Sequence, residues 1–207
     1  MNPFENISPK NKEKLMRSLE ANIHTFKSGM NILSNANNEN LLGIIIYGYI
    51  QIIKTDYNGN ITIIEKLEDN AIFGNMISNI SNNEYQVITK EETKVILLDY
   101  DRILNNLKQN SAYYQFIQNL LKIISNKIHE KNERIEVLTE KTIRNKLLKY
   151  FDVIKPNTYS KIIYLPFTYT ELAEYLSVDR SALMRELKNL RDEGIIETKD
   201  KKIYLKY

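Results

Sequence analysis

Between Phe167 and Leu205 the spacing of apolar residues is helical twice and then becomes alternating. A first helix is indicated by a short apolar face, made of Leu172, Ala173 and Leu176. A second helix is indicated by apolar residues at i, i+4 and i+7, namely Leu183, Leu187 and Leu190. Two short apolar runs, at residues 195–196 and 203–205, then flank a polar tip. The pattern therefore predicts two consecutive helices followed by a β-hairpin.

Residues that begin and end helices stand at the expected places around this pattern. Thr168 is positioned as an N-cap, and Glu171 three residues later completes a capping box. After a turn at residues 177–178, Asp179 is positioned to cap the second helix. Gly194 follows that helix where a left-handed residue is favoured. This order of capped helix, short turn, helix and hairpin indicates a winged helix-turn-helix.

The second helix has a basic face opposite its leucines, made of Arg180, Met184, Arg185, Lys188 and Arg191. An arginine can donate two hydrogen bonds to guanine O6 and N7 in the major groove. Any amphipathic surface helix has one polar face, but the order of elements here favours a DNA-binding role. We predict DNA contacts at Thr168, Tyr169, Arg180, Ser181, Met184, Arg185, Lys188, Lys199 and Lys201, the last two at the hairpin tip.

A long helix free of Gly and Pro is predicted over residues 111–138. Its apolar residues follow a 4-3-4-7-3 spacing, which is the heptad pattern of a two-stranded coiled coil: Ile117, Leu121, Ile124, Ile128, Ile135 and Leu138. The first five are the predicted dimer interface. Lys131 occupies the remaining seam position and should weaken the lower part of the coiled coil. The alternative is that this seam packs against the chain's own N-terminal domain.

The first hundred residues alternate short β-type runs with turn-forming clusters. The runs lie at residues 30–33, 43–54, 60–67 and 94–99, and residues 57–60 form a hairpin-turn signal. Closely spaced strands without an intervening long helix favour a small antiparallel barrel or roll.

Composition narrows the class of protein. No cysteine is present, which excludes disulfides, thiolate-ligated zinc and a cysteine-bound iron-sulfur cluster. Apolar runs are too short to cross a bilayer, and the N-terminus lacks a signal-peptide pattern, so we expect a soluble cytoplasmic protein without membrane contact. Residues 139–207 hold 14 Lys and Arg against 10 Asp and Glu, so the chain's basic excess lies in the predicted DNA-binding part.

Residues 167–190, FTYTELAEYLSVDRSALMRELKNL, resemble the DNA-binding domain of the Crp/Fnr transcription regulators, and the likeness extends over nearly the whole chain. The resemblance implies an α+β chain with an effector-sensing, jelly-roll-like antiparallel β-roll at 1–110, a dimerisation helix at 111–138 and a winged helix-turn-helix at 139–207. It also implies a homodimer on a near-palindromic duplex DNA site, with RNA polymerase as a further partner. Reorientation about a hinge near residues 138–139 is the hypothesis for how its DNA-binding heads respond.

The recognition helix departs from the family pattern at one base-reading position. The family presents an Arg, an acidic residue and a second Arg; Arg180 and Arg185 match, whereas Ser181 replaces the acid. The preferred half-site should therefore differ from that of the cyclic-AMP receptors. Ser177 also replaces the Gly usual in the turn, where a positive φ is costly for other residues.

The roll departs from the family at the cyclic-nucleotide site. Glycines of the roll are matched at Gly48, Gly59 and the pair Phe73-Gly74, but Asn75 and Tyr85 replace the Glu and Arg that hold the ribose and cyclic phosphate. Without that guanidinium we expect neither cyclic AMP nor cyclic GMP. The predicted pocket for another small-molecule effector contains Tyr49, Phe73, Gly74, Asn75, Tyr85 and Gln86. The alternatives are that these aromatic residues are plain core, that the regulator is constitutive, or that the roll is a protein-interaction module.

An enzymatic function has little support in the sequence. Motifs of hydrolases and phosphate-binding loops are missing, and Asp99 and Asp101 fit caps of a helix better than a catalytic pair. His24 and His129 are the only histidines; some gas-sensing relatives use histidine for haem, but exposed surface residues are the simpler reading. We expect a non-enzyme without metal or cofactor.

Overall fold

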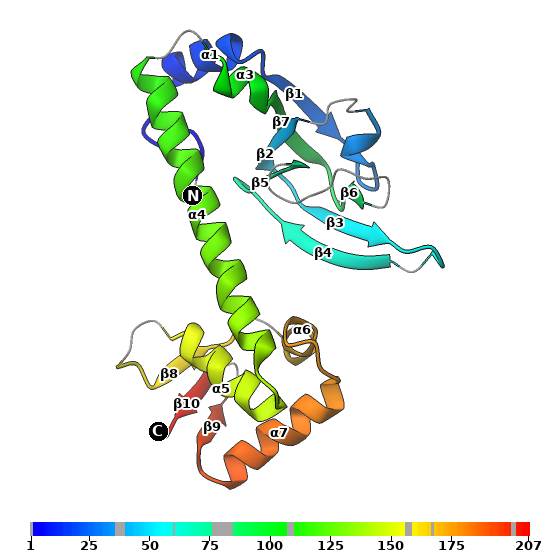
Figure 1. Ribbon diagram of the computed structural model, residues 1–207, viewed down its shortest axis with the longest axis vertical. Helices are drawn as coiled ribbons and strands as arrows, with labels where there is room; N and C mark the ends of the chain where they lie inside the picture. Colours follow the sequence, from blue (N-terminus) through cyan, green and yellow to red (C-terminus); the bar gives the residue numbers. More distant parts are fainter. Residues whose placement is uncertain are drawn as a thin grey trace. The chain divides into compact units, whose positions relative to one another are not determined.

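The computed structural model divides into two compact units, Met1–Ser125 and Asn126–Tyr207, which meet inside helix α4 (Ser111–Thr139) (Figure 1). The structure describes residues 2–35, 40–59, 61–75, 85–106, 110–155, 159–166, 168–199 and 202–207. The long helix predicted over residues 111–138 is therefore confirmed to within one residue. In the described ranges, no helix is both long and apolar enough to cross a membrane.

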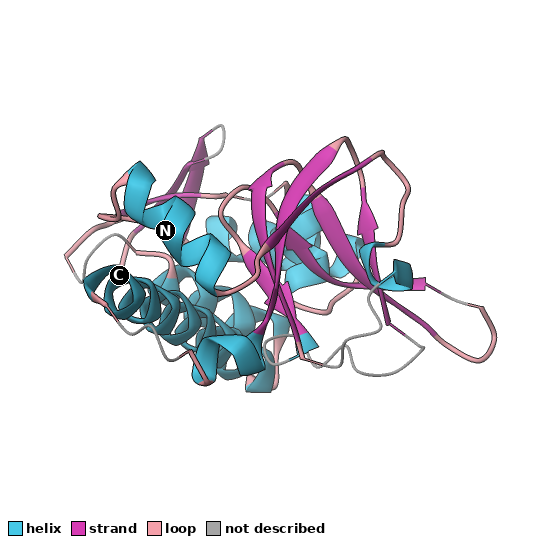
Figure 2. Ribbon diagram, turned by 90° about the horizontal axis from the view of Figure 1, so that it is seen from above, coloured by secondary structure: helices cyan, strands magenta, loops and turns pink. Residues whose placement is uncertain are grey.

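The N-terminal unit contains two antiparallel sheets. One has the order β1 (Asn22–Phe26), β7 (Thr93–Asp99), β2 (Leu41–Tyr47) and β5 (Ile72–Gly74). The other has the order β4 (Ile61–Leu67), β3 (Ile50–Thr55) and β6 (Tyr85–Thr89). The strands appear in magenta in Figure 2 and form the predicted antiparallel roll.

Strand β2 of the first sheet is buried on both faces, which explains its nearly continuous apolar run. Ile45 belongs to the core between the two sheets, together with the β3 residue Ile52 and Phe73 of β5. Leu42 and Ile44 instead pack under the helices α1 (Pro9–Ser18), α3 (Tyr100–Leu104) and the first half of α4. Because successive side chains of a strand point to opposite faces, both faces of β2 must be apolar.

Turns divide the apolar runs where the backbone needs special conformations. Gly48, at φ +111, separates β2 from β3, and a Cβ there would lie 2.5 Å from the hydroxyl of Thr93. Gly59, at φ +82, closes the β3–β4 hairpin as the turn signal predicted. Asn70 is left-handed, with φ 65.

One predicted strand is wrong. Instead of a strand at residues 30–33, the structure has a 3-10 helix, η1 (Ile32–Asn35). The side-chain oxygen of Asn31 accepts hydrogen bonds from the backbone amides of Leu33 at 3.2 Å and Val87 at 3.1 Å. The bond to Leu33 is local, competes with an extended conformation and turns the chain at this point.

The C-terminal unit has a single core built by helices and a three-stranded sheet. Its elements after α4 are α5 (Ile143–Val153), β8 (Ile162–Tyr164), α6 (Tyr169–Tyr175), α7 (Arg180–Asp192), β9 (Ile196–Lys199) and β10 (Lys202–Leu205). The strands pair in the order β8-β10-β9, so the predicted hairpin is present and β8 adds an unpredicted third strand. Val137 of α4 lies fully buried in this core, which attaches the end of α4 to this unit.

Candidate nucleic-acid interface

The helix-turn-helix begins with the predicted capping box. The hydroxyl of Thr168 accepts a hydrogen bond from the amide of Glu171 at 3.3 Å, and the carboxylate of Glu171 accepts one from the amide of Thr168 at 2.9 Å. Two amides at the start of α6 are thereby satisfied. Residue 167, with which the predicted pattern begins, lies outside the described residues.

The turn between the two helices is a Schellman motif with serine in the left-handed position. Ser177 has φ 52, and its amide donates to the carbonyl of Glu174 at 3.1 Å. The amide of Val178 donates to the carbonyl of Ala173 at 3.0 Å, which completes the motif. The chain then enters α7 through Asp179, whose carboxylate accepts from the amides of residues 181 and 182 at 2.8 and 3.1 Å.

The predicted division of α7 into a buried and an exposed face is present in the structure. Its three leucines, Leu183, Leu187 and Leu190, are buried in the core of the unit. Five of the predicted DNA contacts, Arg180, Ser181, Met184, Arg185 and Lys188, are exposed on this helix. Gly194, at φ +72, ends the helix in a second Schellman motif, in which Ile195 donates to Leu190 at 3.0 Å.

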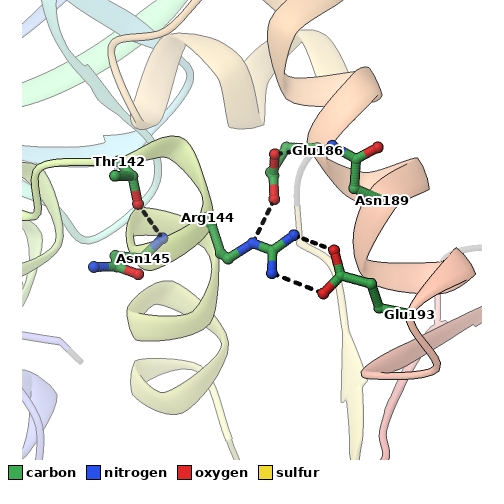
Figure 3. Close-up of polar contacts among 6 residues, drawn as sticks. All are labelled: Thr142, Arg144, Asn145, Glu186, Asn189 and Glu193. Atoms are coloured by element: carbon green, nitrogen blue, oxygen red, sulfur yellow. Dashed lines mark hydrogen bonds and ion pairs between the residues drawn. The ribbon is translucent and has the colours of Figure 1, made fainter.

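Glu186 of α7 and Glu193 at its C-cap are held by an arginine of α5. Arg144 donates from Nε to Glu186 at 2.7 Å and from Nη1 and Nη2 to the two oxygens of Glu193 at 2.7 and 2.5 Å (Figure 3). The hydrogen bonds from Arg144 lower the pKa of Glu193, and those to both carboxylates raise the pKa of Arg144. Two negative charges of the recognition helix are therefore compensated from inside the domain.

The cations of the exposed α7 face have no such compensation. Among the residues that the structure describes, no carboxylate pairs with Arg180, Arg185 or Lys188. Three other cations of the same unit are engaged with carboxylates: Lys149 with Glu136 at 2.8 Å, Lys155 with Asp152 at 2.5 Å and Lys206 with Glu197 at 2.9 Å. The exposed face of α7 therefore presents three positive charges that are available to an external anion.

Sequence reasoning missed the contacts that position α6 and α7. Lys146 of α5 donates to the carbonyl of Leu176 at 3.1 Å and so caps the end of α6. Arg134 of α4 lies over the ring of Tyr175 at 5.1 Å. Neither these residues nor Arg144 carries a local signal, because their partners lie 30 to 49 residues away in the sequence.

The remaining predicted DNA contacts lie on neighbouring elements of the same unit. Thr168 is exposed at the start of α6, whereas Tyr169 is half-buried against the core. Lys199 is exposed at the end of β9, and Lys201 lies outside the described residues. Arg191 donates to the hydroxyl of Thr198 at 3.4 Å, which joins α7 to β9.

The predicted effector residues lie on both sheets of the roll. Phe73 is fully buried, and a Cβ on Gly43 would lie 2.1 Å from its ring. Gly74 is equally confined, because a Cβ there would meet the carbonyl of Leu41 at 2.0 Å. The ring of Phe73 thus fills core space beside Gly43.

The other four predicted effector residues are half-buried: Tyr49, Asn75, Tyr85 and Gln86. The hydroxyl of Tyr49 accepts a hydrogen bond from Gln51 at 3.0 Å. Lys54 lies over the ring of Tyr85, 5.6 Å from its centre, on the neighbouring strand. Tyr85 and Gln86 are adjacent on β6, across the roll from the sheet that carries Phe73.

The predicted seam of α4 divides into two classes of residue. Ile117 and Ile124 are half-buried against the helical layer of the N-terminal unit. Leu121, Ile128 and Ile135 are 61, 54 and 57% exposed, and they are seven residues apart. Packing against the N-terminal unit therefore accounts for Ile117 and Ile124. It leaves an exposed apolar row on α4, made of Leu121, Ile128 and Ile135.

The titratable residues of the alternative functions lie at the start of α3, on β1 and on α4. Asp99 is the N-cap of α3, where it accepts from the amide of Asp101 at 2.9 Å, as predicted for a cap. His24 is exposed on β1 in the N-terminal unit, and His129 contacts Glu133 at 3.1 Å on α4. Over the described ranges, no group of three or more His, Cys, Asp or Glu is arranged to hold a metal ion.

Comparisons with known proteins agree with this architecture. Residues 146–206 match the family model of the Crp-like helix-turn-helix domain. Comparison of the sequence with curated proteins gives no match. Among solved structures, CprK in complex with OCPA is similar over 94% of this chain and 92% of its own, with a TM-score of 0.68 and 15% identity.

Two further solved structures are similar. A CooA mutant from Carboxydothermus hydrogenoformans matches 100% of this chain and 92% of its own, with a TM-score of 0.65 and 16% identity. The c-di-GMP responsive regulator CLP from Xanthomonas campestris matches 94% of this chain and 98% of its own, with a TM-score of 0.53 and 16% identity. The resemblance seen in the sequence is thus confirmed: the chain has the fold of the Crp/Fnr transcription regulators, with a Crp-like helix-turn-helix domain at residues 146–206.

Proposed function

We propose that this chain is a homodimeric, sequence-specific DNA-binding transcription regulator. The observation that carries the proposal is the exposed α7 face, whose cations Arg180, Arg185 and Lys188 have no carboxylate partner among the described residues. Duplex DNA supplies the missing negative charge, and α7 is the helix that enters the major groove in a helix-turn-helix.

The exposed cations have different roles in this proposal. Arg180 and Arg185 lie in the first half of α7 and read base edges, because guanidinium groups match O6 and N7 of guanine. Lys188 and the hairpin residues Lys199 and Lys201 contact phosphates. Thr168 and Tyr169, at the start of α6, contact the same backbone through their hydroxyl groups.

A homodimer follows from the exposed apolar row of α4. Leu121, Ile128 and Ile135 repeat every seven residues, and a second copy of the same helix covers such a row in a two-stranded coiled coil. Two copies present two recognition helices to successive major grooves, about 34 Å apart, so the site is near-palindromic. RNA polymerase is the proposed further partner.

A small-molecule effector other than cyclic AMP is the proposed input. Tyr85 stands where a cyclic phosphate needs a guanidinium. Of the similar structures, CprK is in complex with OCPA and CLP is a c-di-GMP responsive regulator, so this fold accommodates chemically different ligands. The half-buried Tyr49, Tyr85 and Gln86 offer hydroxyl and amide groups for such a ligand. Constitutive activity without ligand is the alternative, favoured by the close packing of Phe73 against Gly43.

The roles proposed here need no resident metal or cofactor. His24 is exposed on β1 and His129 is engaged with Glu133, an arrangement typical of surface residues. An absorbance spectrum of the purified protein should therefore lack a Soret band. A Soret band in the protein as isolated would assign haem to it and contradict this part of the proposal.

Selection from a random duplex library tests the DNA-binding proposal. The wild type should enrich a two-fold symmetric site, and the Arg180→Ala, Arg185→Ala variant should lose the sequence preference. A control variant, Arg17→Ala with Arg102→Ala, removes the same charge from the N-terminal unit and should retain the site.

Two results would contradict the proposal. If both double variants bind the selected site equally, any loss of binding is due to the change in net charge, and α7 does not read the base sequence. Absence of enrichment, both with and without cell extract as a source of effector, favours a protein-interaction module instead.

A further inference from the structure

The recognition face of α7 contains one large apolar residue among polar ones. Met184 is 36% exposed, and no other large hydrophobic residue is exposed along Arg180–Asp192, every residue of which is described. The leucines of this helix fill the core of the unit, so Met184 is outside that core.

Met184 lies on the same stripe as the residues proposed to read bases. It follows Arg180 by four positions and Ser181 by three, and it precedes Lys188 by four, which places one helical turn between neighbours. A base pair contacted by Arg180 therefore has the thioether of Met184 within one turn of helix, and Lys188, one turn further on, contacts the neighbouring phosphate.

The chemistry of the side chain restricts what it can recognise. A thioether has no hydrogen-bond donor and is only a weak acceptor, so it cannot read the polar edge of a base. In the major groove the only apolar group on a base edge is the C5 methyl of thymine. The unbranched methionine side chain has three rotatable bonds and adapts to such a contact.

We propose that Met184 packs against a thymine methyl in each half-site and is a specificity-determining residue. This inference rests on the proposed DNA-binding function and adds the chemical group that is read. Arginines supply guanine recognition on either side, and Met184 selects thymine over cytosine at the position between them.

The test uses the duplex enriched by the wild type. Each thymine of the half-site is replaced in turn by deoxyuridine, which removes the methyl and retains every hydrogen-bonding group. One position should weaken binding about fourfold per half-site, the loss expected for one buried methyl group, and about fifteenfold when both half-sites are changed. Met184→Ser should bind the thymine and deoxyuridine duplexes equally.

Two controls separate this contact from changes in DNA shape. Met184→Leu keeps an apolar side chain and should retain the methyl dependence, and Arg185→Ala should retain it at weaker overall affinity. The inference is overturned if no position responds to deoxyuridine, or if Met184→Ser responds as the wild type does. Failure to select any site overturns the proposed function as well, so the two failures are distinct.

Discussion

The turn of the helix-turn-helix is strained in a way that a single substitution should relieve. Ser177 has φ 52, a conformation that costs a residue with a Cβ about 1–2 kcal/mol. Glycine removes this cost but loses about 0.5–1 kcal/mol more in backbone entropy on folding. Ser177→Gly should therefore raise the free energy of unfolding by about 0.5–1 kcal/mol.

Thermal unfolding followed by far-ultraviolet circular dichroism measures this effect. For a chain of this length about 1 kcal/mol shifts the midpoint by roughly 2–4 °C, so an increase of about 1–4 °C is expected. Gly194→Ser is the matched control, because Gly194 occupies the same position of a Schellman motif at φ +72 and its Cβ would meet no atom within 4 Å. That variant should lose a similar amount. Ser177→Ala keeps the strain and should be neutral; a lower midpoint for Ser177→Gly would refute the reasoning.

Three further predictions concern the ion pairs, the seam and a buried phenol. Arg144→Ala should lower the thermal midpoint, and the difference should shrink as the pH falls below the ordinary pKa of glutamate, because the pKa of Glu193 is lowered in the fold and its stabilising charge is lost there. Ile128→Lys should give a monomer in analytical ultracentrifugation with an unchanged circular dichroism spectrum; a stable dimer would exclude the seam as the interface. Burial raises the pKa of Tyr150 in the folded protein above the value of about 10 that an unfolded chain has. The fold therefore loses stability as the pH rises above about 10, because the unfolded chain can release the phenolic proton and the folded protein cannot. Thermal scans between pH 8 and 11 should show a smaller loss for Tyr150→Phe than for the wild type.

The elements that sequence predicted best are those determined by neighbours in the chain. The capping box of Thr168 and Glu171, the cap at Asp179 and the left-handed Gly194 involve residues within a few positions of each other. Their hydrogen bonds form in any context that lets the helices form, so the local pattern was sufficient.

Elements determined by distant partners were missed. Strand β8 has only three residues and forms because it pairs with β10, which lies about forty residues later in the sequence. The 3-10 helix η1 depends on Asn31, whose carboxamide bonds both to Leu33 and to Val87 on β6. A short apolar run can form a strand or a 3-10 helix, and the distant residues with which it pairs determine which of the two forms.

The candidate site shows the same division at the level of charge. The sequence assigned Arg180, Arg185 and Lys188 to one face from helical spacing alone. It did not indicate that Arg144 forms ion pairs with Glu186 and Glu193 and so neutralises the acidic residues near these cations, because Arg144 is 42 and 49 residues away from them in the sequence. The availability of the cations is a tertiary property, although their arrangement is a local one.

The attachments of α4 bear on where a signal can bend the chain. Three consecutive contacts fix its end to the C-terminal unit: Arg134 over Tyr175 at 5.1 Å, Glu136 with Lys149 at 2.8 Å, and Val137 in the core. A hinge at residues 138–139 would leave Arg134, Glu136 and Val137 on the side of the proposed dimer interface, so that bending there would have to break all three contacts. Lys131, one turn before Arg134, is exposed and occupies the weakest position of the seam. In the proposed dimer, reorientation of the DNA-binding unit should therefore cost least near Lys131, where it would disrupt a poor coiled-coil contact and leave the packing around Tyr175 intact.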